Sequence, residues 1–373
     1  MTRRDWFAFG LVLLVGAIAW RAQLFSRLPL ADEEPYLCAA RALVNERDLT
    51  ACPRYLYSLG VAQAGAWLLR HGGELTFHAC TRGLIWGGAA LTLWLPLTEA
   101  RVSLWSRASA AALAMLLWPP ATQAMTYGNL SAATAGLTVL ALTWRRAHPW
   151  YAGLALGAAI ALKPLPAAVP IVLLAQASAS ALRTRRWRSP ELTTGLFASL
   201  FALVVTAWGG GLPALPSSAE ATNLITVARL VRELGGNASE LACFVAVLLV
   251  GAALATSARF AHPKLLDGLS LVVSLLAAPL VWNHSFLLVT PLLIAAAVHA
   301  LSRYRGAPSG EPRKWALLGV LASACATLAV AFSDDFGNVS NSMPLGALPL
   351  LLPLLSPAAL LGYLAFSKYS GVK

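Results

Sequence analysis

One apolar run and the acidic residues that follow it decide the interpretation of this chain. The run is WFAFGLVLLVGAIAWRAQL, residues 6–24, and the acidic stretch ADEEPY follows at residues 31–36. Nineteen residues of helix extend about 28 Å, which is close to the ~30 Å hydrocarbon core of a bilayer. No small-residue cleavage site ends the run, so the sequence predicts an uncleaved membrane span that delivers three carboxylates to the far surface.

Runs of the same kind recur along the whole chain. Of its 373 residues, 58% are hydrophobic and 12% are charged, whereas a soluble protein has about 25% charged residues. This composition excludes a soluble globular enzyme, a disordered chain and a small disulfide scaffold. We expect an all-α polytopic membrane protein, a single domain over residues 1–373, with about twelve transmembrane helices. They are expected near 6–24, 82–98, 106–124, 130–143, 150–162, 165–182, 192–209, 239–257, 264–282, 284–301, 314–332 and 343–366.

The basic residues give the expected orientation. With twelve spans, 18 of the 28 Lys and Arg residues fall on the side of both termini, and 11 of the 16 acidic residues fall on the other. The positive-inside rule makes the first side cytoplasmic. Residues 26–81 then form the first extracytoplasmic loop, and residues 210–238 form a second large outer loop.

The first outer loop is predicted to contain helices that lie on the membrane surface. Tyr36, Ala40, Leu43 and Val44 share one helical face, which is typical of an amphipathic surface helix. Residues 55–69 are apolar enough to span, but inserting them would send most of the inner basic residues outside. Three cysteines share this loop, and an odd number fixes no pairing: Cys38, Cys52 and Cys80.

A few polar residues stand at the outer ends of the predicted spans. Lys163 lies between two short helices that Pro164 and Pro166 separate, and His284 joins two spans with almost no loop. Ionisable groups at membrane depth are costly and mark functional sites by default. Lys163 could instead snorkel to the interface and His284 could be a turn residue. Helix capping is the alternative role of Asn129 and Asn237.

Together these groups suit transfer of a sugar from a lipid phosphate. A carboxylate, Asp32 or Glu33, can accept the proton of an acceptor hydroxyl. Cationic side chains can neutralise the charge that develops on a phosphate leaving group. Attack from the face opposite the phosphate would invert the anomeric centre. The candidate phosphate-binding residues are Lys163, Arg229, Arg232 and His284.

The same residues carry a resemblance to a known family. The chain resembles GT-C type polytopic glycosyltransferases, and among them glycosyltransferase family 87, the polyprenol-phosphate-mannose-dependent mannosyltransferases. Asp32-Glu33 stands where GT-C enzymes carry an acidic pair. The other matching positions are Tyr36, Ala39, Ala40 and Leu43; Tyr55 and Tyr57; Gly128-Asn129; Ala152-Gly153; Ala161-Leu162-Lys163-Pro164; Arg185-Arg186-Trp187-Arg188; Gly236-Asn237; and Pro279, Trp282 and His284.

The resemblance covers roughly residues 1–305 and implies roles for several of them. It implies Asp32 as the base and His284 as a phosphate contact. It implies substrate-binding positions at Tyr36, Tyr57, Asn129, Asn237 and Trp282. Ala238 departs from the family, which usually has Gln there, and Glu33-Glu34-Pro35 is more acidic than usual. The sugar, the acceptor and the choice between Asp32 and Glu33 therefore stay open.

The expected partners are a polyprenyl-phosphate-sugar donor, a glycolipid or glycan acceptor and membrane lipids, with no nucleic acid. Mannose is the sugar that the family implies, and a pentose such as arabinose is allowed. No cofactor or metal is expected, although three adjacent acids could bind a divalent ion. Richness in Ala, Leu and Arg suggests a bacterial inner membrane with the site on the periplasmic face. The alternatives are a lipid or sugar transporter or flippase, which would show inverted repeats, and a ligase that uses a lipid-pyrophosphate donor.

Overall fold

In a computed structural model of the chain, most of the described residues form helices. The described residues are 2–24, 26, 28–49, 52, 55, 57–98, 103–185, 187, 189–208, 227, 231, 239–278, 281, 283–306, 311–331 and 348–369. They contain no strand, which confirms the all-α prediction. The chain divides into two compact units, unit 1 (Met1–Pro166 and Leu196–Pro216) and unit 2 (Ala167–Gly195 and Ser217–Lys373). The single domain and the count of transmembrane helices stay predictions.

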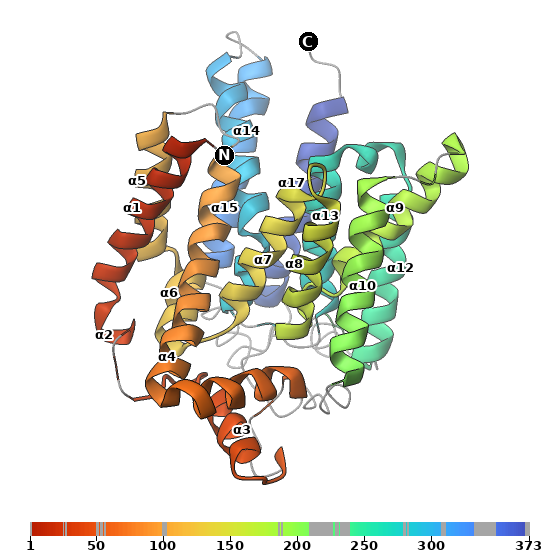
Figure 1. Cartoon of the computed structure of the whole chain (residues 1–373). Coiled ribbons are helices and arrows are strands. Elements are labelled where there is room, and N and C mark those ends of the chain that lie inside the picture. Colours follow the sequence, from red (N-terminus) through yellow and green to blue (C-terminus); the bar gives the residue numbers. More distant parts are fainter. Residues whose placement is uncertain are drawn as a thin grey trace. The chain divides into compact units, whose positions relative to one another are not determined.

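Unit 1 contains the N-terminal helices and the predicted first loop. Its helices are α1 (Arg3–Ala19), α2 (Arg21–Leu24), α3 (Glu34–Val44), α4 (Leu59–Thr98), α5 (Leu104–Leu117), α6 (Pro119–Tyr127), α7 (Ser131–Trp144) and α8 (Pro149–Leu162), with α10 (Pro190–Trp208) entering from unit 2. A break at Gly73, whose φ is 70°, divides α4 into two arms. In Figure 1 the first arm lies beside α3, and the second arm runs away from it, packed against α7 of the same unit.

Unit 2 contains the remaining helices. They are α9 (Ala168–Thr184), α12 (Glu240–Ala255), η3 (Ala258–Ala261), α13 (Pro263–Ala277), η4 (Asn283–Val289), α14 (Thr290–Gly306), α15 (Glu311–Ala331) and α17 (Leu348–Tyr369). Within this unit α13 packs against α9, α12 and α17, and its buried side chains form the centre of the unit.

Prolines and glycines set the helix ends that matter for the site. The predicted run 106–124 is two helices, because Trp118 is extended and Pro119 and Pro120 start α6 anew. Lys163 is also extended, as expected for a residue before proline, and α8 ends at Leu162. The predicted break at Pro164 is therefore confirmed.

Close contact between α4 and α7 fixes the start of α7. A Cβ at Gly136 would lie 2.5 Å from the Gly88 Cα atom, so only glycines let these two backbones touch. Ser131 begins α7, and Asn129 lies two residues before it, so both stand at the end of a helix that is packed on α4.

The helices show a large apolar surface. Among the described residues, two helices are long and apolar enough to cross a membrane by length and composition, Pro190–Ala207 and His284–Gly306, and several shorter apolar helices accompany them. Large apolar side chains on unit 1 are exposed, including Ile18 (61%), Leu117 (71%) and Leu203 (66%). An exposed surface of this kind is typical of a protein that contacts lipid or a partner.

Candidate functional site

Asp32 lies in the tight turn that precedes α3. Its backbone N–H donates to the Tyr127 carbonyl at 2.7 Å, and the Asn129 Nδ2 group donates to its Oδ2 atom at 2.8 Å. These contacts join the first loop to the junction between α6 and α7. Asp32 is half-buried, so its carboxylate is oriented by the Asn129 amide and is partly open to a ligand.

Gly128 allows the turn that contains Asp32 to lie this close to Tyr127 and Asn129. It caps α6 with a φ of 77°, a left-handed conformation that side chains rarely adopt. A Cβ added there would lie 2.9 Å from the Leu30 Cβ and 3.2 Å from the Glu33 Cβ. Any other residue at this position would therefore push the Asp32 turn away from Asn129.

Lys163 joins the same network from the turn between α8 and α9. Its ammonium Nζ donates to the Ser131 Oγ at 2.7 Å and to the Asn129 Oδ1 at 3.3 Å. Asn129 thus contacts Asp32 with its amide nitrogen and Lys163 with its amide oxygen. Burial lowers the pKa of Lys163 to about 8, and the negative charge of Asp32 partly opposes that shift.

Two phenols complete this cluster. The Tyr36 hydroxyl donates to the Tyr57 hydroxyl at 2.7 Å, and the Leu130 N–H donates to the Tyr36 hydroxyl at 3.4 Å. Burial raises the pKa of both phenols, so they stay neutral and act as hydrogen-bonding groups. The Ser58 hydroxyl donates to the Ala161 carbonyl at 3.0 Å, which docks the segment before α4 on the end of α8.

Glu33, the second acid of the pair, lies in different surroundings. Its side chain is fully buried, and one carboxylate oxygen lies 2.8 Å from the His78 Nδ1 atom. The other accepts from the Arg82 guanidinium at 2.7 Å and from the Leu30 N–H at 3.0 Å. The sequence left the choice between the two acids open, and the geometry gives them separate environments.

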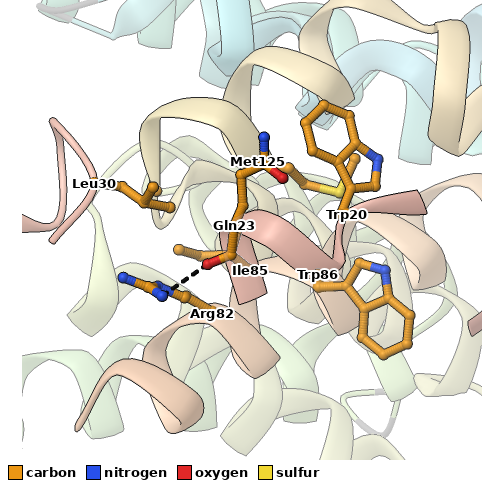
Figure 2. Close-up of a pocket in the computed structure, with 8 residues that line it drawn as sticks. Trp20, Gln23, Leu30, Arg82, Ile85, Trp86 and Met125 are labelled. Atoms are coloured by element: carbon orange, nitrogen blue, oxygen red, sulfur yellow. Dashed lines mark hydrogen bonds between the residues drawn. The ribbon is translucent and has the colours of Figure 1, made fainter. Parts of the chain in front are cut away.

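The cavity next to Arg82 is too small for a sugar. Its volume is about 20 Å³, room for one water molecule, and Trp20, Trp86 and Met125 line it. Figure 2 shows Arg82 hydrogen-bonded to the Gln23 carbonyl at one side of this space and the two indoles at the other. Substrate therefore has no room beside Arg82, in contrast to the half-exposed Asp32.

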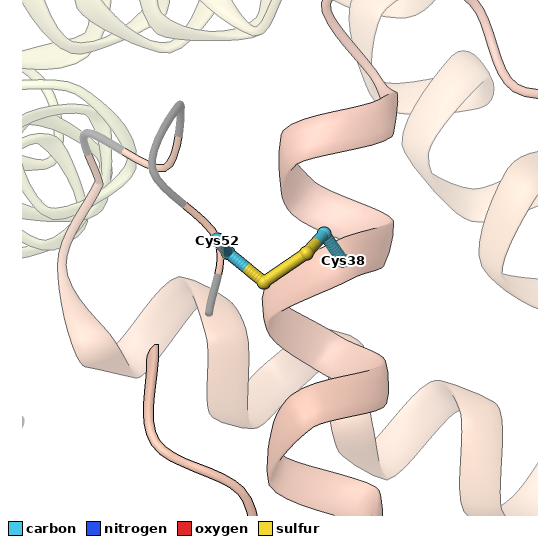
Figure 3. The surroundings of a disulfide bond; sticks show 2 residues. All are labelled: Cys38 and Cys52. Atoms are coloured by element: carbon cyan, nitrogen blue, oxygen red, sulfur yellow. A yellow bond between two sulfur atoms is a disulfide. The ribbon is translucent and has the colours of Figure 1, made fainter. Parts of the chain in front are cut away.

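A disulfide joins Cys38 on α3 to Cys52 (Figure 3), with their Cα atoms 5.9 Å apart. It closes the loop that precedes Tyr55 and Tyr57, and Cys80 is free and exposed. The sequence could not choose among the three cysteines, because the pairing depends on how this segment folds back on α3. A disulfide persists in an oxidising compartment, which agrees with an extracytoplasmic first loop.

We expect Cys38→Ser to destabilise the first loop by about 3 kcal/mol, the value for a bridge that closes a loop of about 15 residues. Transfer activity in membranes should then be lost at a lower temperature, and dithiothreitol should reproduce the effect in the unaltered protein. Cys80→Ser is the matched control and should change neither property. Maleimide labelling of Cys38 or Cys52 in untreated cells would contradict the pairing.

The remaining candidates belong to unit 2 or lie outside the described residues. His284 is buried at the start of η4, in unit 2, and its role at a phosphate stays a prediction. Four other candidates lie outside the described residues: Arg229, Arg232, Asn237 and Trp282. Within the described part of the chain no three His, Cys, Asp or Glu side chains gather around a common point, and metal independence stays a prediction.

Sequence reasoning missed three contributors to this site. Ser131 accepts from Lys163, and His78 and Arg82 hold Glu33. A signal for the last two was present, because a His and an Arg four residues apart share one face of an apolar helix. Nothing local in the sequence marks Ser131.

The described residues are mostly helical, and within them one amide joins a carboxylate to an ammonium, an arrangement that suits a transferase acting on a phosphate-linked donor. The family model for glycosyltransferase family 87 matches residues 66–291, more than half of the chain. The chain therefore belongs to glycosyltransferase family 87 and is a GT-C type integral membrane glycosyltransferase, as its motifs indicated. The matched region includes Arg82, Asn129, Lys163 and His284, and it begins after Asp32.

Comparisons with curated proteins and with solved structures add no further evidence on the function. No curated protein matches the chain. Among solved structures, the chain is similar to the crystal structure of ArnT from Cupriavidus metallidurans bound to undecaprenyl phosphate, with 17% identity and a TM-score of 0.43. The similarity covers 98% of this chain and 79% of that chain. At this distance the likeness bears on neither the site nor the substrate.

Proposed function

We propose that the protein transfers a sugar from a polyprenyl-phosphate donor to an acceptor hydroxyl, with inversion, on the extracytoplasmic face. The observation that carries this proposal is the Asp32–Asn129–Lys163 network. It places a carboxylate and an ammonium on opposite sides of one amide group, at 2.8 Å and 3.3 Å from its two polar atoms. A base and a phosphate-binding cation are the two groups that such a transfer needs.

In the proposed reaction Asp32 accepts the proton of the acceptor hydroxyl as its oxygen attacks the anomeric carbon. The bond from that carbon to the phosphate oxygen breaks, and polyprenyl phosphate leaves with the electron pair. Lys163 binds the phosphate group of the donor and neutralises its negative charge. The Tyr36–Tyr57 pair provides neutral hydroxyl groups to a bound sugar, and His284 is proposed as a further phosphate contact through the family resemblance.

Membrane placement follows the same proposal. α3 and the first arm of α4 would lie on the outer surface of a bacterial inner membrane, with both termini in the cytoplasm. The Cys38–Cys52 disulfide supports the outer placement of this loop. Mannose is the proposed sugar, because it is the sugar that family 87 implies, and the acceptor is proposed to be a glycolipid or a glycan.

The test is transfer of radiolabelled sugar from a panel of polyprenyl-phosphate sugars, with mannose and arabinose donors included, in membranes that express the chain. We expect label to move to a new glycolipid or glycan with at least one monophosphate donor. Transfer only from a lipid-pyrophosphate donor would favour the ligase instead. No transfer from either donor class, with native acceptors supplied, would favour a transporter, for which lipid translocation is the next assay.

A further inference from the structure

The Glu33 carboxylate is fully occupied by groups of the protein itself. Leu30 and Arg82 donate to Oε2, with the Arg82 Nε at 3.1 Å and its Nη2 at 2.7 Å, while His78 lies against Oε1. The side chain shows no exposed surface. A carboxylate with this many protein partners and no access has no position from which to meet an acceptor hydroxyl.

Arg82 uses all five of its N–H groups in this cluster. Two from Nη1 reach the Gln23 and Ser26 carbonyls at 2.7 Å and 2.6 Å, and one from Nη2 reaches the Leu28 carbonyl at 2.7 Å. Figure 2 shows the first of these bonds. The guanidinium therefore ties the chain that leaves α2 to the second arm of α4, and its remaining N–H groups hold Glu33.

Glu33 also closes the turn that contains Asp32. The Leu30 N–H donates to the Glu33 side chain at 3.0 Å, and the Glu33 N–H donates back to the Leu30 carbonyl at 2.9 Å. Asp32 lies in the turn that these two Leu30–Glu33 hydrogen bonds close, directly before Glu33. A shift of Glu33 therefore moves Asp32 relative to Asn129, whose amide orients its carboxylate.

We propose that Glu33, Arg82 and His78 form a positioning cluster for Asp32, in which Glu33 acts through the turn and does not take the acceptor proton. This inference rests on the proposed function, because it assigns the base to Asp32. Arg82 and His78 set where Glu33 lies, and Glu33 sets where Asp32 lies. A displacement of about 1 Å at a reacting group costs about 100-fold in rate.

The test compares Glu33→Gln and Arg82→Lys with the unaltered enzyme, with donor binding and turnover measured separately. Radiolabelled polyprenyl phosphate counts the folded sites, and kcat is expressed per site. We expect kcat to fall about 10- to 100-fold in both variants, with the donor KM within about 2-fold. The double variant should be no slower than the slower single variant, because both changes act on one contact.

The exposed Arg41–Glu74 pair supplies matched controls, since it is also an arginine–carboxylate pair on α3 and α4. Arg41→Lys and Glu74→Gln should leave kcat and KM unchanged. Glu33→Asp, which keeps the charge and shortens the side chain, serves as a second probe if Glu33→Gln gives too few folded sites. If Glu33 acts by positioning, replacing its carboxylate with an amide should cost less activity than removing the side chain. The kcat of Glu33→Gln should therefore exceed that of Glu33→Ala.

Two results would overturn the proposal. Complete loss in Glu33→Gln, together with substantial activity in Glu33→Asp, would make Glu33 the base. Fewer donor-binding sites with unchanged kcat per site would make the cluster a stability element alone. Failure of the proposed function itself is distinguishable, because then the unaltered enzyme would show no transfer or Asp32→Asn would retain full activity.

Discussion

Asp32→Asn should abolish sugar transfer while leaving the protein folded. The asparagine keeps the shape of the side chain, and its oxygen can still accept from the Asn129 amide that now lies 2.8 Å from Asp32 Oδ2. What is lost is the ability to accept a proton, which contributes about 10²- to 10⁴-fold to rate. We expect kcat to fall by about 10³-fold, as measured by transfer of labelled sugar at equal amounts of folded enzyme.

Glu34→Gln is the matched control for this change. Glu34 is exposed, two residues along the chain, and in the same acidic stretch. It should keep full activity, because removal of one negative charge from this surface leaves Asp32 in place. Equal losses in the two variants would show that the net charge of the stretch matters and that Asp32 is not a specific base.

Lys163→Met should weaken use of the donor more than it slows turnover. The methionine fills the same buried space, and Asn129 keeps its contact with the Ser131 N–H at 2.9 Å. A hydrogen bond to a charged group contributes about 1.5–3 kcal/mol, so the donor KM should rise about 10- to 100-fold. Titration with the donor at a fixed acceptor concentration measures this rise, and an unchanged KM would remove Lys163 from the phosphate site.

The pH dependence gives Lys163 a separate signature. Since burial lowers its pKa to about 8, the ammonium loses its proton as the pH rises through that value. The ratio kcat/KM for the donor reports the free enzyme, so it should decline above about pH 8 in the unaltered protein. Lys163→Met has no charge to lose there and should show a low, flat profile between pH 7 and about pH 9.

The helices could largely be predicted from the sequence. The predicted runs 130–143 and 150–162 are α7 (Ser131–Trp144) and α8 (Pro149–Leu162), each within one residue of the expected ends. Apolar length and a proline or glycine at the end are local properties, so they can be read without knowledge of the fold. The break at Trp118 differs from the predicted single run 106–124, because the apolar character of the sequence continues across Pro119 and Pro120.

Part of the site could also be predicted. Asp32, Asn129 and Lys163 were named from their expected place at the outer ends of spans, and the structure joins these three in one network. His284 was named on the same grounds and belongs to unit 2. The tyrosines were named through the resemblance alone, and their mutual hydrogen bond adds a contact that the pattern did not contain.

The sequence alone determined that this is a helical membrane protein with carboxylates at the start of its first loop, because composition and apolar periodicity are local. Only the tertiary structure distinguished the surroundings of Asp32 from those of Glu33, since two adjacent acidic residues are equivalent in the sequence until their hydrogen-bond partners are known. Those partners stand 97 residues away for Asp32, at Asn129, and 45 and 49 residues away for Glu33. Helix packing, through the Gly88–Gly136 contact and the left-handed Gly128, brings such distant groups within hydrogen-bond reach.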